Sequence, residues 1–354
     1  MATITVPTAK WGFFPLDERL ELWDKHYSEA VAKQALWLSG LVDFEQAAEV
    51  MEQVGQVSIS TSSVWRHSAR WAQRGQEVEA AQQAKANALP QREEVVAEAA
   101  RDQGRMGAAM DGAMVHIRGE GWKELKVGCV FDIEVRPTFD KKTEEWVDLA
   151  HALHNTYVAH LGEAAAFGQV LWAEAQARHF TQACQTQVLG DGSVWIWNLV
   201  KQHFYDSVQT VDWYHATEHL AEAARLLEGE GTPQARKWYK ARETRLYEGE
   251  AYAIAQELFK AAETKPQVAK ELSTQAGYFE TNQRRMQYME LREDDWLIGS
   301  GMVESGCKQF RARFVGSGMR WSRAGAERLV PVRAAIMSRR FDAFWQAAYN
   351  SPQN

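Results

Sequence analysis

The stretch GAAMDGAMVHI, residues 107–117, places one carboxylate, Asp111, in the middle of an apolar, β-prone run. Two more short β-prone runs follow it, KELKVGCVFDIE at residues 123–134 and TYVAHL at residues 156–161. Beyond them the pattern predicts helices at 164–180 and 195–203 and strands at 185–189 and 208–211. Strands followed by helix–strand alternation are typical of an α/β core.

A long helical block follows this alternation, from residue 216 to about residue 295. Its apolar residues recur at helical spacing, for example at Ala251, Ile254, Ala255, Leu258, Phe259 and Ala262. A block of this kind predicts that the α/β core is interrupted by a helical insertion.

The N-terminal part of the chain is also expected to be helical. One helical face is formed by Phe44, Ala47, Ala48 and Met51, and Gly55 ends that helix. Ser58 or Ser60 can cap the next helix. Its inner stripe would consist of Val64, Ser68, Trp71 and Ala72, with Arg66 and Arg70 facing outward. Two helices joined by a short turn are compatible with a helix-turn-helix that binds DNA, although any two packed helices give a similar pattern.

The composition is that of an ordinary globular protein, with 45% hydrophobic and 25% charged residues among 354. A net charge of −7 excludes a protein coated with positive charge, such as a histone. Three widely spaced cysteines, Cys129, Cys184 and Cys307, are expected to be reduced thiols. We see no signal peptide and no apolar run of about 18 residues. The sequence therefore predicts a cytoplasmic protein.

Two aspartates, Asp111 and Asp191, each lie among apolar residues and each precede a glycine. A carboxylate in apolar surroundings is costly unless a cation pairs with it, so either residue is a candidate metal ligand. Asp-Gly is also the commonest two-residue hairpin turn, and this alternative stays open.

A third carboxylate, Glu304, follows the Gly-Ser-Gly turn at residues 299–301. The charges after it are almost all positive, at Lys308, Arg311, Arg313, Arg320, Arg323, Arg328, Arg333, Arg339 and Arg340. Concentrated positive charge indicates a site for a polyanion such as nucleic acid. The alternative is an acid that favours the first turn of a helix, followed by an ordinary basic surface.

Three carboxylates from separate elements suit Mg²⁺, which prefers oxygen ligands and keeps several waters. Two such ions can activate a water and stabilise the leaving oxygen in phosphoryl transfer. Asp111, Asp191 and Glu304 would be the smallest ligand set for them.

A short segment between these acids contains His215, Glu218 and His219 and matches the H-x-x-E-H pattern of zinc peptidases. A peptidase would leave the basic segment and the apolar-flanked aspartates without a role. We expect instead that Asp212 and His215 form a hydrogen-bonded pair that supports the site.

Taken together, Met110-Asp111-Gly112, residues 188–192 (VLGDG), residues 212–215 (DWYH) and residues 299–305 (GSGMVES) resemble bacterial insertion-sequence transposases of the ISKra family. These are DDE-type enzymes with an RNase H-like core, related to Mutator-like elements. The segment GSGMRWSRAGAERL at residues 316–329 strengthens the resemblance, which covers roughly residues 105–345.

The resemblance implies that Asp111, Asp191 and Glu304 are the catalytic, metal-binding acids, with two Mg²⁺ ions that Mn²⁺ can replace. Asp212 and His215 would be supporting residues. The residue patterns and the resemblance together predict the domain order. It comprises an N-terminal helix-turn-helix-like domain (1–75), a helical connector (76–105), the first part of the core (106–215), the helical insertion (216–295), the second part of the core with a basic helix (296–345) and a tail (346–354). Pro331 is expected to kink the last helix or delay its start.

The expected function is a nucleoid-associated DNA transposase that cleaves element ends and joins them to target DNA. Its partners would be terminal inverted repeats and target DNA, bound through Arg66, Arg70, Lys308, Arg311, Arg313, Arg320 and Arg323, in a homodimer or larger oligomer. The alternatives are a DNA-binding regulator of the same fold that does not cut, a structure-specific nuclease with the same core, and a zinc peptidase using the H-x-x-E-H segment.

Overall fold

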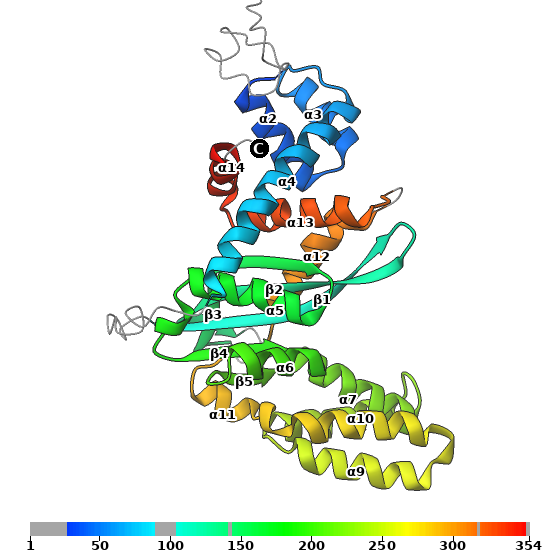
Figure 1. The fold of residues 1–354 in the computed structure, drawn as a ribbon. Helices are drawn as coiled ribbons and strands as arrows, with labels where there is room; N and C mark the ends of the chain where they lie inside the picture. The colour runs from blue at the N-terminus through cyan, green and yellow to red at the C-terminus, as the bar shows by residue number, and fades with distance from the viewer. Residues whose placement is uncertain (1–26, 89–103, 141–143, 317–318, 352–354) are drawn as a thin grey trace, which may run out of the picture. The chain divides into compact units, whose positions relative to one another are not determined.

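The computed structural model describes residues 27–88, 104–140, 144–316 and 319–351 (Figure 1). The strands are β1 (Arg105–Ile117), β2 (Gly121–Asp140), β3 (Glu145–Leu161), β4 (Thr186–Gly190) and β5 (Val208–Val211). The helices are α2 (Glu29–Leu41), α3 (Phe44–Gln53), α4 (Thr61–Ala86), α5 (Ala164–Ala177), α6 (Val194–His203), α7 (Trp213–Glu228), α8 (Pro233–Tyr247), α9 (Ala251–Thr264), α10 (Ala269–Asn282), α11 (Tyr288–Glu293), α12 (Gly301–Phe314), α13 (Arg323–Met337) and α14 (Phe341–Asn350).

The strands form one mixed sheet in the order β3-β2-β1-β4-β5. β2 and β3 pair as a long antiparallel hairpin, whereas β1, β4 and β5 run parallel to one another. Parallel neighbours need a crossover connection, and α5 and α6 supply the helices of these crossovers. The expected α/β class is confirmed.

Helices cover both faces of the sheet at β2. The position of a Cβ on Gly128 of β2 would meet Phe167 and Leu171 of α5. The preceding residue, Val127, points to the other face, and Gly306 of α12 packs there. Because side chains alternate along a strand, α5 and α12 lie on opposite faces. The sheet is therefore an inner layer, which explains the continuous burial from Leu125 to Phe131.

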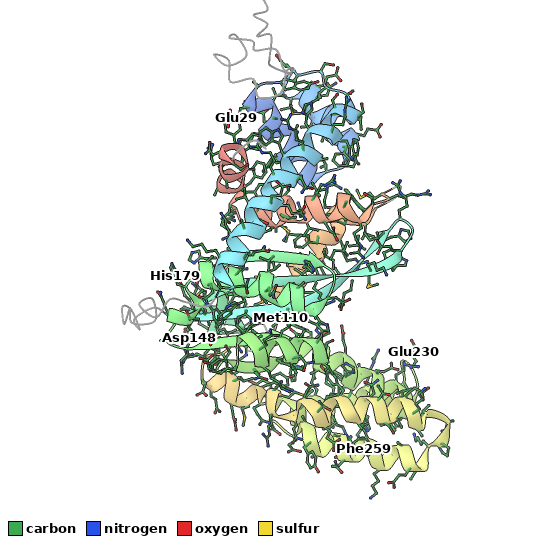
Figure 2. All side chains as sticks on the ribbon, in the orientation of Figure 1. Glu29, Met110, Asp148, His179, Glu230 and Phe259 are labelled. Carbon is green, nitrogen blue, oxygen red and sulfur yellow. The ribbon has the colours of Figure 1, made fainter. Side chains whose placement is uncertain are left out.

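The helical insertion is built from α7, α8, α9 and α10, which pack as neighbours (Figure 1). In α9 the apolar stripe predicted from spacing is buried at Ala251, Ile254, Ala255, Leu258 and Ala262. Phe259, labelled in Figure 2, belongs to the same helix and is half-buried. Helical spacing therefore identified the inner face of this helix correctly.

The chain divides into two compact units. The central unit comprises Gln82–His116 and Glu120–Arg311, and so contains the sheet and the insertion. The terminal unit comprises Met1–Ala81, Ile117–Gly119 and Ala312–Asn354. This division differs from the expected domain order, because α13 and α14 group with the N-terminal helices. The boundary expected at residues 75 and 76 falls inside α4, and the expected tail begins inside α14.

The N-terminal helices of the terminal unit bury the predicted residues. Ala47, Ala48 and Met51 of α3 and Val64 of α4 belong to one apolar cluster. Ser68, Trp71 and Ala72 are buried as expected, and Ser60 accepts the Ser63 amide at the start of α4 at 3.3 Å. The predicted helix–turn–helix pair is thus present in outline.

Pro331 does not delay the start of α13, which was one of the two expected effects, because it lies well inside the helix. A proline cannot donate to the carbonyl four residues earlier, which here belongs to Glu327. The side-chain amide of Gln76 reaches that carbonyl instead, at 3.5 Å. The missing backbone bond is thus partly replaced from α4.

Sequence patterning underestimated the length of β2 and β3. The two strands remain paired from Leu125–Leu161 to Asp140–Glu145. Residues 134–137 of β2 are all exposed, so no apolar alternation marks this half of the hairpin. Where a strand extends beyond the layered core, both of its faces are exposed, so its sequence lacks the apolar alternation that predicts a strand.

Candidate active site

Strand register places three aspartates side by side. β1 pairs with β4 as far as Met110–Gly190, and β4 pairs with β5 as far as Gly190–Val211. The residue that follows these last pairs is Asp111 within β1, Asp191 just after β4 and Asp212 just after β5. Neighbouring strands lie about 4.8 Å apart, so the three residues are neighbours at one level of the sheet. Met110, labelled in Figure 2, marks this level on β1.

Asp111 is half-buried within β1 and is not in a hairpin turn, so the turn alternative is wrong for this residue. Burial raises the pKa of the Asp111 carboxyl, and the charge of Asp191 raises it further. Hydrogen bonds from the Gly112 amide, at 2.7 Å, and from the Cys307 thiol act in the opposite direction. The charge of His215 also lowers the pKa, but burial outweighs these opposing effects.

Asp191 follows β4 in a loop that leads into α6, so it is not in a hairpin turn either. Its Oδ1 accepts the Ser193 amide at 2.8 Å, and its Oδ2 accepts the Ser193 hydroxyl at 2.9 Å. Gly192, between them, has a φ of +98°, a conformation that favours glycine. The carboxylate is therefore held by its own loop.

Asp212 is buried, with 2% exposure, and connects β5 to two helices. One oxygen caps α7 by accepting the His215 amide at 2.9 Å and lies 3.3 Å from the His215 Nδ1. The other oxygen accepts the amide of Ser300, just before α12. Burial alone would raise the pKa of Asp212, but the hydrogen bonds from His215 and Ser300 outweigh it, so that the pKa is lowered. Asp212 therefore stays ionised.

His215 contacts Asp212 and feels the charges of Asp191 and Asp111. The hydrogen bond to Asp212 is the main reason that its pKa is raised to about 9, against the effect of burial. The charges of Asp212, Asp191 and Asp111 contribute in the same direction. The imidazole is therefore a cation at neutral pH, and the expected Asp212–His215 pair is present.

Glu304 lies in the first turn of α12, and its Oε1 is 2.7 Å from the Nζ of Lys308. One turn later on the same helix, the Cys307 thiol contacts Asp111. Burial raises the pKa of Cys307, and the charges of Asp111 and Glu304 raise it further. Glu304 and Asp111 therefore both act on Cys307, but the Glu304 carboxylate is paired with a lysine.

Among the described residues, no group of three or more His, Cys, Asp or Glu side chains is arranged to hold a metal ion. The expected three-carboxylate ligand set is not assembled in this conformation. Asp111 and Asp191 alone present oxygen donors of like charge, which is a donor chemistry that suits Mg²⁺. Glu304 would join them only after leaving Lys308.

The H-x-x-E-H segment lies on α7, where His215 and His219 have different partners. His219 Nδ1 is 2.6 Å from the Oε1 of Gln275, and its ring stacks on Tyr278 at 3.6 Å. Glu218 is exposed. His215 contacts Asp212, so the two histidines have different partners.

Two of the arginines expected to bind DNA, Arg66 and Arg70, lie on α4 in the terminal unit and are exposed. The Arg66 guanidinium donates to the Ser62 carbonyl and the Ser63 hydroxyl, both at 3.3 Å. Arg70 lies 6.0 Å from the ring centre of Trp71. Both side chains are on the outer face, as predicted.

The basic residues after Glu304 are less uniform than expected. Lys308, Arg311 and Arg320 are exposed, and Arg323 pairs with Glu327 at 3.3 Å.

Arg313 is buried, and the expectation that it binds DNA is wrong. The residue is 1% exposed, and its Nε donates to the Ser39 carbonyl at 2.7 Å. Its guanidinium stacks against Phe44 and Trp321. Burial lowers its pKa to about 10. Arg313 follows the buried Phe310 by three residues, and this spacing places both on one helical face and so indicates burial.

Sequence reasoning missed three residues next to the acids, namely Ser193, Cys307 and Tyr278. Cys307 could have been found, because it follows Glu304 by three residues on one helical face. Tyr278, whose hydroxyl donates to the Asp191 carbonyl at 2.9 Å, carried no sequence signal because it is 87 residues away.

No model of a known protein family matches the chain, and no curated protein matches it either. None of the helices in the described part combines the length and apolar composition needed to cross a bilayer.

Proposed function

We propose that this chain is a DNA transposase of the DDE type, in which the central unit is an RNase H-like nuclease core. The observation that carries the proposal is the placement of Asp111 and Asp191 at one level of adjacent parallel strands. The sheet, with an antiparallel hairpin beside parallel strands, supports such a core. Glu304 begins a helix that contacts Asp111 through Cys307.

Asp111 and Asp191 would hold Mg²⁺. Glu304 would become the third carboxylate ligand after giving up its ion pair with Lys308. Bound there, the ions would lower the pKa of a water and stabilise charge on the leaving oxygen of a phosphodiester. Ser193 keeps both oxygens of Asp191 in place. Asp212 fixes the turn before α12 through Ser300 and thereby the start of the helix that carries Glu304.

The basic side chains support DNA as the substrate. Lys308 and Arg311 are exposed on α12, one and two turns beyond Glu304. Phosphates bound at these positions would bring a phosphodiester to the carboxylates. Arg66 and Arg70 on α4 would contact the terminal repeats, and Arg320 and Arg323 would add phosphate contacts. Joining two ends requires at least two copies, so we propose a dimer or larger oligomer.

The test is cleavage of a plasmid carrying the DNA that flanks the coding sequence on both sides. With Mg²⁺, the wild-type chain should nick the element ends, and Asp111→Asn should reduce the rate by about 100-fold or more, at about 1.4 kcal/mol per tenfold. The matched control is Asp206→Asn, which alters an exposed aspartate in the α6–β5 turn. Equal rates for wild type and Asp111→Asn would refute the proposal.

A second candidate is a DNA-binding regulator that does not cut. The Glu304–Lys308 ion pair favours it, because a lysine then occupies the carboxylate that a metal would need. Specific binding to the flanking DNA without any Mg²⁺- or Mn²⁺-dependent nicking would support this candidate over the transposase.

A further inference from the structure

One side chain of α10, in the helical insertion, reaches the loop that carries Asp191. Tyr278 on α10 donates its hydroxyl to the main-chain carbonyl of Asp191 at 2.9 Å. This bond joins the insertion to the loop between β4 and α6. Ser193 holds the Asp191 carboxylate from within that loop, whereas Tyr278 holds the loop itself from outside.

The Tyr278 ring lies directly over Gly192. A Cβ at Gly192 would be 2.5 Å from Cε2 of the ring, which is closer than real Cβ contacts. The φ of +98° at Gly192 also excludes ordinary side chains. The loop therefore follows a path that only glycine allows, and this path brings the backbone up against the tyrosine.

The tyrosine ring is in turn fixed by His219. The two rings stack at 3.6 Å between centroids with 21° between their planes. His219 Nδ1 is 2.6 Å from the Oε1 of Gln275, and an amide oxygen only accepts, so Nδ1 carries the proton. Gln275 and Tyr278 are on α10 and His219 is on α7, so two helices hold the ring. This contact gives the second histidine of the H-x-x-E-H segment a role that needs no metal.

We propose that Tyr278, supported by His219, is a positioning residue for Asp191, so that the helical insertion sets the place of one candidate metal ligand. The proposal rests on the function proposed above, since the metal is what Asp191 would hold. Tyr278 contacts neither the carboxylate nor a reacting atom in the structure, and it acts through the backbone of the loop.

The test compares Tyr278→Phe with Tyr239→Phe. Each variant removes one hydroxyl that donates over 2.9 Å, but Tyr239 bonds Glu243 on its own helix, α8. The first readout, in metal-free protein, is hydrogen exchange of the peptide spanning residues 188–196, which contains the Ser193 amide. Tyr278→Phe should accelerate its exchange about 2- to 10-fold, the range expected for one lost hydrogen bond, and Tyr239→Phe should not.

The second readout is Mn²⁺ affinity by electron paramagnetic resonance. Tyr278→Phe should weaken it about 2- to 10-fold and Tyr239→Phe should leave it unchanged. Equal exchange and equal affinity in the two variants would overturn the positioning role. Mn²⁺ binding that Asp111→Asn does not affect would instead count against the proposed function, and the exchange readout would still decide whether Tyr278 holds the loop.

Discussion

The backbone amide of Ser300 donates to the carboxylate of Asp212, 88 residues earlier in the chain. This bond connects the end of β5 to the turn before α12, and it is buried at both ends. The same aspartate caps α7 through the amide of His215. One carboxylate therefore fixes the starts of two helices, and one of these helices carries Glu304.

Asp212→Asn should destabilise the central unit by about 1–3 kcal/mol, because a neutral amide replaces an ionised acceptor that is buried and fully used. Urea unfolding at pH 7 measures the loss. Asp206→Asn is the control and should change stability by less than about 0.5 kcal/mol. A difference between the two variants below that value would contradict the role given to Asp212.

The pKa of His215, raised to about 9, predicts that metal-free protein loses stability in mild alkali. A raised folded-state pKa gives a contribution that is complete below the unfolded value of about 6.5 and lost as pH rises towards 9. The half-exposed ring reduces the effect to roughly 1–2 kcal/mol. Urea unfolding at pH 6 and pH 9 measures the decrease in unfolding free energy for the wild type and for His215→Gln. The decrease should be smaller in His215→Gln by the contribution of His215. An identical decrease in both proteins would show that His215 is not its source.

Lys308→Met should strengthen Mn²⁺ binding, because it releases Glu304 from an ion pair of 2.7 Å. Surface pairs contribute about 0–1 kcal/mol, so the expected gain is up to about fivefold. Lys240→Met, which breaks a similar pair with Glu243 in the insertion, is the control. Titration of Mn²⁺ without DNA measures the effect, and unchanged or weaker binding in Lys308→Met would argue that Glu304 is not a ligand.

Arg311→Met and Arg313→Met should have opposite consequences although the residues are two apart. Arg311 is exposed, so its loss should reduce the salt slope of DNA binding by about 1 and leave stability nearly unchanged. Arg313 is buried against Ser39, so its loss should cost about 2–4 kcal/mol of unfolding free energy with the slope unchanged. Filter binding across salt concentrations and urea unfolding separate the two, and the reverse pattern would overturn both assignments.

Arg66→Ala combined with Arg70→Ala should weaken binding to the flanking DNA more than to unrelated DNA, if α4 reads a terminal repeat. Arg320→Ala should weaken both equally, as a phosphate contact does. Arg236→Ala, at an exposed position on α8, is the control. Competition binding with the two DNAs measures the ratio, and an unchanged ratio in the double variant would count against readout by α4.

Local patterns predicted most of the secondary structure correctly, and they singled out Asp111 and Asp191 as candidates. Asp111 was detectable because it interrupts an apolar strand and Asp191 because it directly follows one, where an unpaired charge is costly. Glu304 was detectable because it begins a basic segment.

The remaining features depend on contacts between distant segments. The Asp212–Ser300 and Asp191–Tyr278 bonds span 88 and 87 residues, and no periodicity encodes such partners. The ion pair of Glu304 with Lys308 depends on the rotamers of the two side chains, which the sequence does not specify. Arg313 looked like one more surface cation because a run of charges hides the single member on the inner face of the helix.

Anomalous diffraction from crystals soaked in Mn²⁺ decides whether Asp111 and Asp191 hold a divalent ion together. We expect a peak within about 2.3 Å of an oxygen of both carboxylates, with Glu304 turned from Lys308 towards it. Mn²⁺ bound elsewhere, with no peak between these two aspartates at saturating concentration, would contradict this expectation.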